Sequence, residues 1–126
     1  MTAPVASVGA ETSLADIARQ LTAGRYSGVP VVDGEHRVIG FVSEIDLMTA
    51  LLNGRDGTTP ASELMSSPVV SVDEFETTDE VMSILRARSI HHLPVVRQDR
   101  LVGIITPADV VRFLVERLLP VPPEAG

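Results

Sequence analysis

The segment Gly40-Phe41-Val42-Ser43-Glu44-Ile45-Asp46 decides how this chain folds, because it recurs as Gly103-Ile104-Ile105-Thr106-Pro107-Ala108-Asp109. An earlier segment also recurs, since Val29-Pro30-Val31-Val32 corresponds to Leu93-Pro94-Val95-Val96, 64 residues later. Self-similarity at a nearly fixed spacing indicates a repeated structural unit. Two copies of one unit therefore fill nearly the whole chain of 126 residues.

Each copy alternates strand-like and helix-like hydrophobic periods. The predicted elements of the two copies are short strands at 5–8 and 69–72, helices capped by Ser13 and Thr77, hairpins of 29–32 with 38–42 and 93–96 with 101–105, and last helices at 44–52 and 107–119. A helical turn is expected at 61–65. The polar, turn-rich segment 53–60 separates the copies, and the tail 121–126 is expected to fray because it lacks apolar periodicity.

A β-α-β-β-α unit of this size cannot cover both faces of its small sheet alone. We therefore predict an α/β fold in which two repeats, residues 1–60 and 61–126, pack on one another about a pseudo-twofold axis. Each repeat is expected to hold a small sheet with flanking helices.

Composition narrows the functional classes. The ten basic residues are all Arg against 17 acidic residues, a net charge of −7, and aromatic residues make up 3% of the chain, which argues against nucleic acid as a partner. The chain has no cysteine, so disulfides, thiolate metal sites and cysteine nucleophiles are excluded. Apolar runs are short and the N-terminus lacks a signal-peptide pattern, so we expect a cytoplasmic protein with no membrane association.

The repeated motif has a chemical and a structural interpretation. Each copy has a hydroxyl at the start of its last helix, from Ser43 or Thr106, where the first-turn amides favour an anion. One turn further on, the carboxylate of Asp46 or Asp109 can accept hydrogen bonds from ribose hydroxyls. Such a site suits a nucleoside phosphate. The same spacing is also a helix-capping box, and on spacing alone capping is the favoured interpretation.

The two copies, with their Pro-Val-Val strands and Gly-h-h-[Ser/Thr]-x-x-Asp motifs (h, apolar), resemble a tandem pair of CBS domains, the Bateman module, over residues 3–119. The resemblance implies a stand-alone regulatory module, with a role such as energy sensing. It also implies an adenosyl ligand, AMP, ADP, ATP or S-adenosylmethionine, bound in clefts between the repeats. By position, Asp46 and Asp109 would hold ribose, and Ser43 and Thr106 would contact phosphate or ribose.

Further site residues follow from the same resemblance. His91 and His92 precede the second Pro-Val-Val strand and would contact phosphate, whereas the first copy has only Ser27 and Gly28 there. Glu44 also adds negative charge next to Ser43. We therefore expect the cleft of Thr106 and Asp109 to accept a phosphorylated ligand better than the cleft of Ser43 and Asp46.

Val5 and Val69 could line the base slot, although simple core packing explains them equally well. The histidines do not form a metal-ligand set, so no metal site is predicted.

The last helices indicate how the protein assembles. Their apolar residues cover more than one stripe, which predicts a homodimer formed through the last helix of each repeat. No catalytic constellation is apparent, so an enzyme is not expected, and a protein effector would receive the signal. The alternative is a dimerisation or protein-interaction module whose nucleotide clefts are degenerate.

Overall fold

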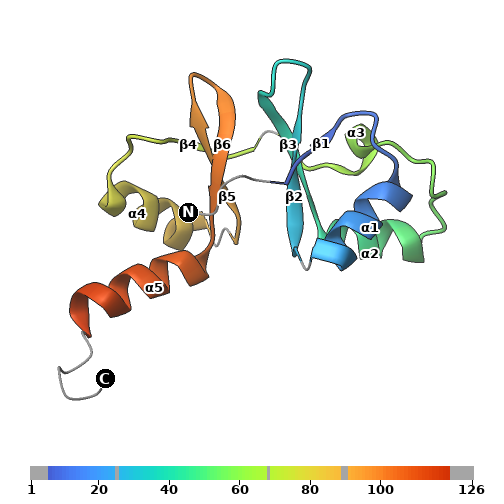
Figure 1. Cartoon of the computed structure of the whole chain (residues 1–126). Coiled ribbons are helices and arrows are strands. Elements are labelled where there is room, and N and C mark those ends of the chain that lie inside the picture. The colour runs from blue at the N-terminus through green and yellow to red at the C-terminus, as the bar shows by residue number, and fades with distance from the viewer. Residues whose placement is uncertain (1–5, 25, 68, 89–90, 120–126) are drawn as a thin grey trace.

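The computed structural model describes residues 6–24, 26–67, 69–88 and 91–119, which form two units side by side (Figure 1). The first unit contains β1 (Val8–Gly9), α1 (Leu14–Gly24), β2 (Gly28–Val32), β3 (Val38–Ser43), α2 (Glu44–Leu52) and α3 (Ala61–Leu64). The second unit contains β4 (Val72–Asp73), α4 (Thr78–Arg88), β5 (Leu93–Arg97), β6 (Arg100–Ile105) and α5 (Pro107–Leu118). The predicted α/β fold of two repeats is confirmed.

The two sheets have the same topology. Each has three strands, in the orders β1-β2-β3 and β4-β5-β6, with the first pair parallel and the second pair antiparallel. The register shifts at the same point in both hairpins, after Val31 in one and after Val95 in the other. The internal sequence repeat is therefore also a structural repeat, down to the irregularity in the sheet.

The first strand of each repeat is shorter than predicted and lies further along the chain. β1 pairs only Val8 and Gly9 with β2, and β4 pairs only Val72 and Asp73 with β5. Val69 and Val70 precede the paired residues of β4 and line a pocket. The predictions for Val5 and for the tail 121–126 fall outside the described residues.

The capping residues begin the helices as predicted. The Asp16 amide donates to Ser13 Oγ at 3.2 Å, and the Glu80 amide donates to Thr77 Oγ1 at 3.2 Å. Both helices bury one apolar stripe, as their 3.6-residue period requires. The buried positions are Leu14, Ile17 and Leu21 in α1, and Val81 and Leu85 in α4.

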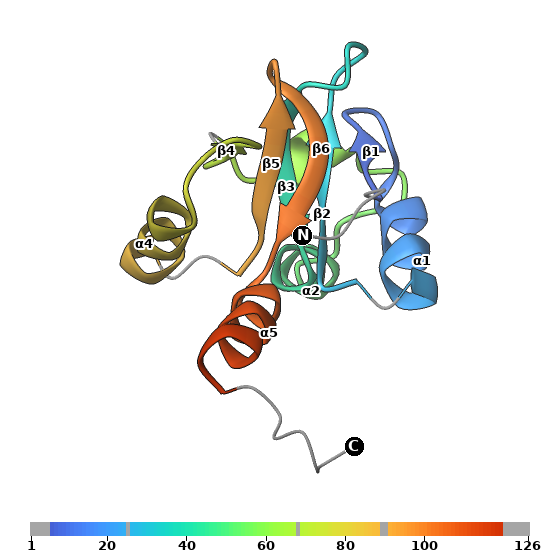
Figure 2. The same ribbon diagram turned by 60° about the vertical axis from the view of Figure 1, so that its left-hand side comes forward.

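The two cores differ in size. In the first unit α1, α2 and α3 all contribute to one buried cluster around Val31 and Val42, and α3 adds Ala61 and Leu64 to it. The cluster of the second unit is smaller, and α5 buries none of its residues. Figure 2 shows α5 projecting away from the second sheet, whereas α2 lies under the first.

The hairpin ends join the units. The Leu101 amide donates to the His36 carbonyl at 3.0 Å, and an isolated antiparallel bridge links Arg37 with Arg100. The two-residue turn Gln98–Asp99 has φ of 50° and 67°, the left-handed conformation that a tight hairpin turn requires. The sheets therefore meet edge to edge at this end of the molecule.

We predict that Ile17→Ala lowers the free energy of unfolding by about 2–5 kcal/mol, because it leaves a cavity in the larger core. Phe75→Ala is the control, since Phe75 is 86% exposed and its loss should change stability by less than about 0.5 kcal/mol. Urea denaturation measures both. Equal losses in the two variants would contradict this description of the core.

Candidate functional site

A pocket of 250 Å³ lies between the two units. The first unit contributes Phe41 and Ser43 from β3, and the second contributes His91 and His92, which come directly before β5. The chain between the units adds Ser66, Val69 and Val70. Of the residues selected from the sequence, the structure thus brings together Ser43, Val69, His91 and His92.

The connecting chain reaches this pocket because it pairs with β3. The Phe41 amide donates to the Ser66 carbonyl at 3.2 Å, and the Ser66 amide donates to the Phe41 carbonyl at 2.9 Å. Gly40 makes the approach possible, since a Cβ there would lie 2.3 Å from Met65 Sδ. The close approach that Gly40 permits is therefore to Met65 of the chain itself.

Both repeated motifs form complete capping boxes. Asp46 Oδ2 accepts from the Ser43 amide at 2.9 Å and from Ser43 Oγ at 3.0 Å, and the Asp46 amide donates to Ser43 Oγ at 3.2 Å. Thr106 and Asp109 repeat this arrangement at 2.9, 3.2 and 3.4 Å. The structural interpretation of the motif is confirmed in both copies, and the ligand role of these residues stays a prediction.

The two carboxylates differ in their other contacts. Asp109 Oδ1 accepts from Arg112 Nη1 at 3.3 Å, whereas Asp46 Oδ1 makes no hydrogen bond within the described residues. Burial raises the pKa of Asp109, but the Thr106 hydrogen bonds and the positive charges near it, Arg112 among them, lower it, so the pKa is lowered overall. Asp46 does not itself line the pocket; it orients Ser43, which does.

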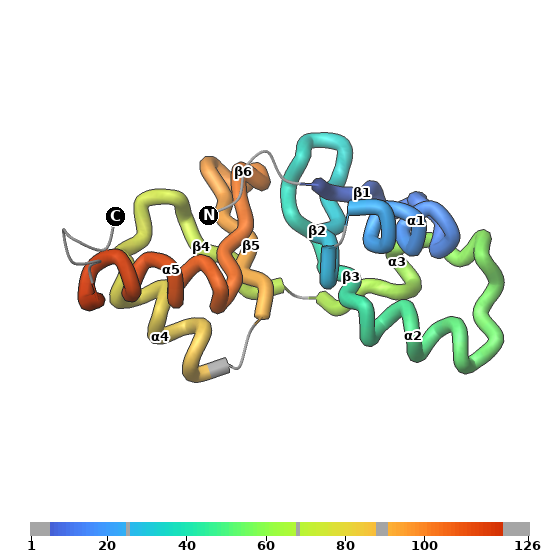
Figure 3. Tube along the Cα trace, turned by 60° about the horizontal axis from the view of Figure 1, so that its bottom comes forward, coloured from blue at the N-terminus to red at the C-terminus, as the bar shows by residue number. Residues whose placement is uncertain are grey.

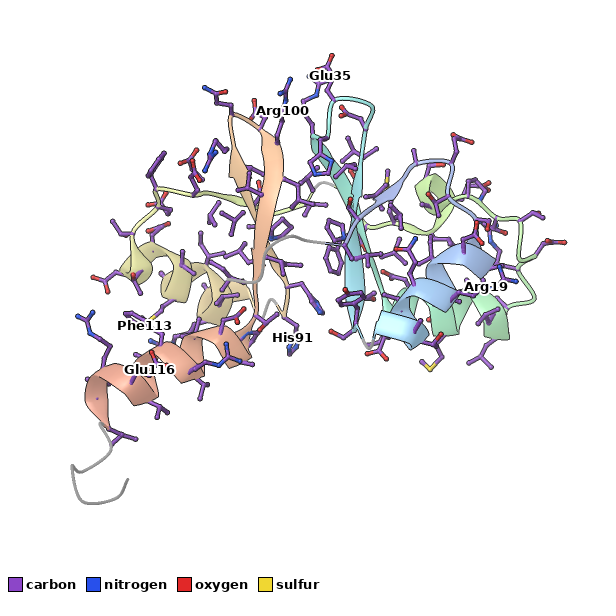
Figure 4. All side chains as sticks on the ribbon, in the orientation of Figure 1. Arg19, Glu35, His91, Arg100, Phe113 and Glu116 are labelled. Atoms are coloured by element: carbon purple, nitrogen blue, oxygen red, sulfur yellow. The ribbon has the colours of Figure 1, made fainter. Side chains whose placement is uncertain are left out.

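His92 connects the two units. Its ring stacks on Phe41 with centroids 4.9 Å apart and planes tilted by 31°, and Nε2 hydrogen-bonds Ser27 Oγ. Burial lowers the pKa of His92, the charge of His91 lowers it further, and Glu44 opposes both. The imidazole is therefore mainly neutral at pH 7. Figure 4 shows His91 beside the end of β5, on the side of the second unit that faces the first.

This geometry corrects the pairing of the histidines. The sequence predicts that they serve the cleft of Thr106 and Asp109, but both line the pocket of Ser43, which residues of both units form. Asp109 lines a separate 240 Å³ pocket between α4 and α5. Glu44 lines a groove on α1 and α2 and does not line the Ser43 pocket, although its charge acts on His92.

Sequence reasoning missed Phe41, Ser66 and Val70 as pocket residues and Ser27 as the partner of His92. Phe41 occupies an apolar position of the repeated motif, so its pattern indicates only a strand. Ser27 and Gly28 align with His91 and His92 in the repeat, and this correspondence is the feature of the sequence that could have indicated Ser27. Gly28 is itself needed, since a Cβ there would lie 2.5 Å from the Phe41 ring.

The described residues contain no group of three or more His, Cys, Asp or Glu side chains placed to hold a metal ion. Nor does this part of the chain include a helix with the length and apolar character needed to cross a membrane.

The CBS domain family model matches residues 1–53 and 61–116, so the chain belongs to the CBS domain family. The CBS domain-containing protein YhcV of Bacillus subtilis is 30% identical over 110 residues, which cover 86% of this chain and 78% of that protein.

Two solved structures are also similar. A putative acetoin utilization protein (AcuB) from Vibrio cholerae matches with a TM-score of 0.84 and 32% identity, covering 94% of this chain and 88% of that one. CBSX2, solved in complex with AMP, matches with a TM-score of 0.77 and 28% identity, covering 90% of this chain and 89% of that one. The chain is therefore a CBS domain pair, a module of the regulatory kind.

We predict that His92 makes the protein less stable in mild acid. Because folding lowers the pKa of His92, the unfolded chain binds more protons than the folded chain once the pH falls through about 6.5. The contribution of His92 to the free energy of unfolding is fully present above about pH 6.5, and it is lost as the pH falls towards the pKa of His92 in the folded protein. Denaturation at several pH values should show a shallower decrease in His92→Gln than in the wild type.

His36→Asn is the control, because His36 is exposed in the hairpin turn and Asn tolerates its φ of 66°. This variant should keep the wild-type dependence on pH. An unchanged dependence in His92→Gln would contradict the proposed environment of His92.

Proposed function

We propose that this CBS pair binds an adenosyl ligand in the pocket of Ser43, and that the ligand changes the relative orientation of the units or their affinity for a partner. The observation that carries the proposal is that both units build the pocket. A ligand that touches both can favour one relative orientation to the extent that it binds that orientation more tightly. The AMP complex of the related CBSX2 supports an adenine nucleotide as the ligand.

The pocket residues divide into an apolar and a polar group. Phe41, Val69 and Val70 offer flat, apolar contact for a base, and Ser43 offers a hydroxyl at the start of α2. A ribose beyond Ser43 would meet Asp46, whose Oδ1 makes no hydrogen bond within the described part of the chain. These assignments keep Ser43, Asp46 and Val69 in the roles that the family resemblance implies.

Phosphate recognition falls mainly to the two histidines. The Glu44 amide already donates to the Ser27 carbonyl at 2.9 Å, and the Asp46 amide donates to Ser43 Oγ, so two first-turn amides of α2 are occupied. His91 and His92 are the residues of this pocket that can carry a positive charge. A phosphate next to His92 would favour its protonated form and raise its pKa. We therefore now assign the stronger phosphate site to the Ser43 pocket.

Thr106 and Asp109 remain candidates for a second adenosyl site, related to the first by the repeat. Their hydroxyl and carboxylate repeat the geometry of Ser43 and Asp46. We further propose a regulatory and not a catalytic role, in the cytoplasm, with the response passed to a protein effector. The alternative, an interaction module with degenerate clefts, is favoured by one observation: both capping boxes are complete without a ligand.

We also propose a homodimer through the last helix of each unit. Ile45, Met48, Leu51 and Leu52 on α2 are exposed, as are Val111, Phe113, Val115 and Leu118 on α5. Burying a Leu side chain fully gains about 1.5–3 kcal/mol, so such a surface favours association.

The ligand proposal predicts that AMP raises the melting temperature and that Asp46→Ala reduces this shift much more than Asp109→Ala does. Asp109→Ala is the matched comparison, because it removes the equivalent carboxylate of the other repeat, whose site is the weaker one in this proposal. Both variants lose the carboxylate half of the capping box and keep the N-cap hydroxyl, so each should lose a similar amount of stability, about 0.5–1.5 kcal/mol for each lost hydrogen bond. A thermal-shift series with AMP, ADP, ATP and S-adenosylmethionine, and with GMP as the negative control, measures the difference.

Two outcomes would contradict this assignment. Equal loss of the AMP shift in Asp46→Ala and Asp109→Ala would mean that the Ser43 pocket has no special role. No shift with any adenosyl ligand at millimolar concentration would favour the interaction module with degenerate clefts.

The dimer proposal predicts twice the monomer mass by light scattering at tens of micromolar protein. Leu118→Glu should give monomers, because it places a charge on the exposed face of α5, where Leu118 is 70% exposed. Phe75→Glu, an equally drastic change on another surface, should leave the dimer intact. A monomeric wild type would contradict the proposal.

A further inference from the structure

The short helix α3 fills a space in the first unit between α1, α2 and β3. Its residues Ala61 and Leu64 are buried in the first core. Figure 3 shows α3 in the same unit as α1 and α2, whereas α4 and α5 are the helices of the second unit in the part of the chain that the structure describes. Among the described residues, the second repeat therefore has no equivalent of the segment that completes the core of the first.

A pocket of 240 Å³ lies at the equivalent place in the second unit. Residues of α4, β6 and α5 line it, and these elements correspond to the α1, β3 and α2 that α3 contacts. The apolar residues of the lining are Val81, Met82, Ile105, Val110 and Phe113.

The exposure of these residues shows what α3 does for the first unit. Phe113 is 36% exposed, whereas Ala50, at the same position of the first repeat, is 8% exposed. Ile105 is half-buried, and its equivalent Val42 is fully buried. The second unit thus leaves apolar side chains partly open to solvent at positions that the first unit buries.

The first unit also shows how the backbone of a covering segment is held. The Leu14 amide donates to the Thr59 carbonyl at 2.7 Å, and the Ala61 amide donates to the Thr12 carbonyl at 2.8 Å. The segment therefore runs antiparallel to the chain at the start of α1 and then forms one helical turn.

The same backbone groups are open in the second unit. Thr78 is the equivalent of Leu14, and Glu76 is the equivalent of Thr12; both are exposed. Neither the Thr78 amide nor the Glu76 carbonyl makes a hydrogen bond to another described residue. A segment placed as α3 is placed would meet a donor and an acceptor at matching positions.

The surroundings of this pocket are acidic. Glu76 lines it, and Asp79 and Glu80 follow in the first turn of α4. None of the three forms an ion pair within the described ranges. At the equivalent positions the first repeat has one carboxylate, that of Asp16. The charge therefore favours a basic segment in the second unit.

Phe75 adds an exposed aromatic side chain next to the same place. It lies in the turn before α4, one residue before Glu76, and it is 86% exposed. The turn is fixed, because the Phe75 amide donates to Asp73 Oδ1 at 2.9 Å and the Glu74 amide donates to the Val96 carbonyl at 2.8 Å. Aromatic residues are enriched in protein interfaces, so this position favours a protein partner.

We infer that the pocket between α4 and α5 binds a basic segment of a partner protein that has the form of α3: an extended stretch that ends in Pro, then one helical turn with apolar residues at positions i and i+3. This inference rests on the protein effector of the proposed function and gives that effector a binding surface. With 3.6 residues per turn, Val110 and Phe113 lie on one side of α5 and Val111 and Leu118 on another. The proposed dimer surface therefore stays available.

A synthetic peptide of residues 57–66 serves as the probe, because this segment fills the equivalent place in the first unit. It carries Glu63→Lys, at an exposed position, and Gly57→Lys. A Cβ at Gly57 would lie 3.5 Å from the Ala15 Cβ, and the equivalent of Ala15 in the second unit is Asp79. We expect fluorescence anisotropy to show saturable binding of this peptide to the full chain. Leu64→Asn in the peptide should weaken binding about tenfold or more, as for a residue at the centre of an interface.

A charge exchange tests whether the peptide binds in the orientation of α3. Asp79→Lys in the protein should weaken binding about two- to five-fold, and a peptide with Gly57→Glu should recover most of this loss. Asp16→Lys is the matched control, because it changes an exposed carboxylate on α1, where α3 already covers the unit. It should leave binding of the peptide unchanged.

Three results would overturn the inference: no binding of the peptide, binding that neither Leu64→Asn nor Asp79→Lys weakens, or binding only after residues 1–5 are removed, which would mean that the chain itself covers the pocket. The AMP shift is measured on the same preparations. A normal AMP shift without peptide binding would reject this surface and leave the ligand proposal standing. Peptide binding without an AMP shift would support the surface and favour the interaction module with degenerate clefts.

Discussion

A three-stranded sheet flanked by two helices cannot bury both of its faces, and this constraint makes the two repeats pack on one another. The contacts that join them follow from it: the Leu101 amide donates to the His36 carbonyl at the hairpin ends, and His92 stacks on Phe41 near the middle. The pocket of Ser43 lies at this junction because β3 of one repeat and the chain before β5 of the other meet there. A site between repeats is thus a consequence of the same packing that stabilises the fold.

His92 contacts residues of two separate hollows of the molecule. It lines the pocket of Ser43, and it hydrogen-bonds Ser27, which lines the α1–α2 groove together with Glu44. A phosphate placed next to His92 would compete with Ser27 for the imidazole.

The two repeats differ in their cores and in how their last helices pack. The first has the larger core, reinforced by α3, and its last helix lies close under the sheet. The second has a smaller core, and its α5 leaves its apolar side chains exposed. His91 and His92 of the second repeat correspond to Ser27 and Gly28 of the first, yet they line the pocket of Ser43. Neither repeat forms the Ser43 pocket by itself.

The sequence alone determined the repeat, the order of strands and helices, the capping residues and the family, because these depend on local periodicity and on motifs of a few residues. It also selected Ser43, Val69, His91 and His92. Only the tertiary structure decided which of these residues meet: the histidines join Ser43 and not Thr106, and Phe41, Ser66 and Ser27 join them. The physical reason is that the pocket is built across the interface between the repeats. A motif repeated in sequence specifies each half of that interface, and the packing of the two halves specifies their pairing.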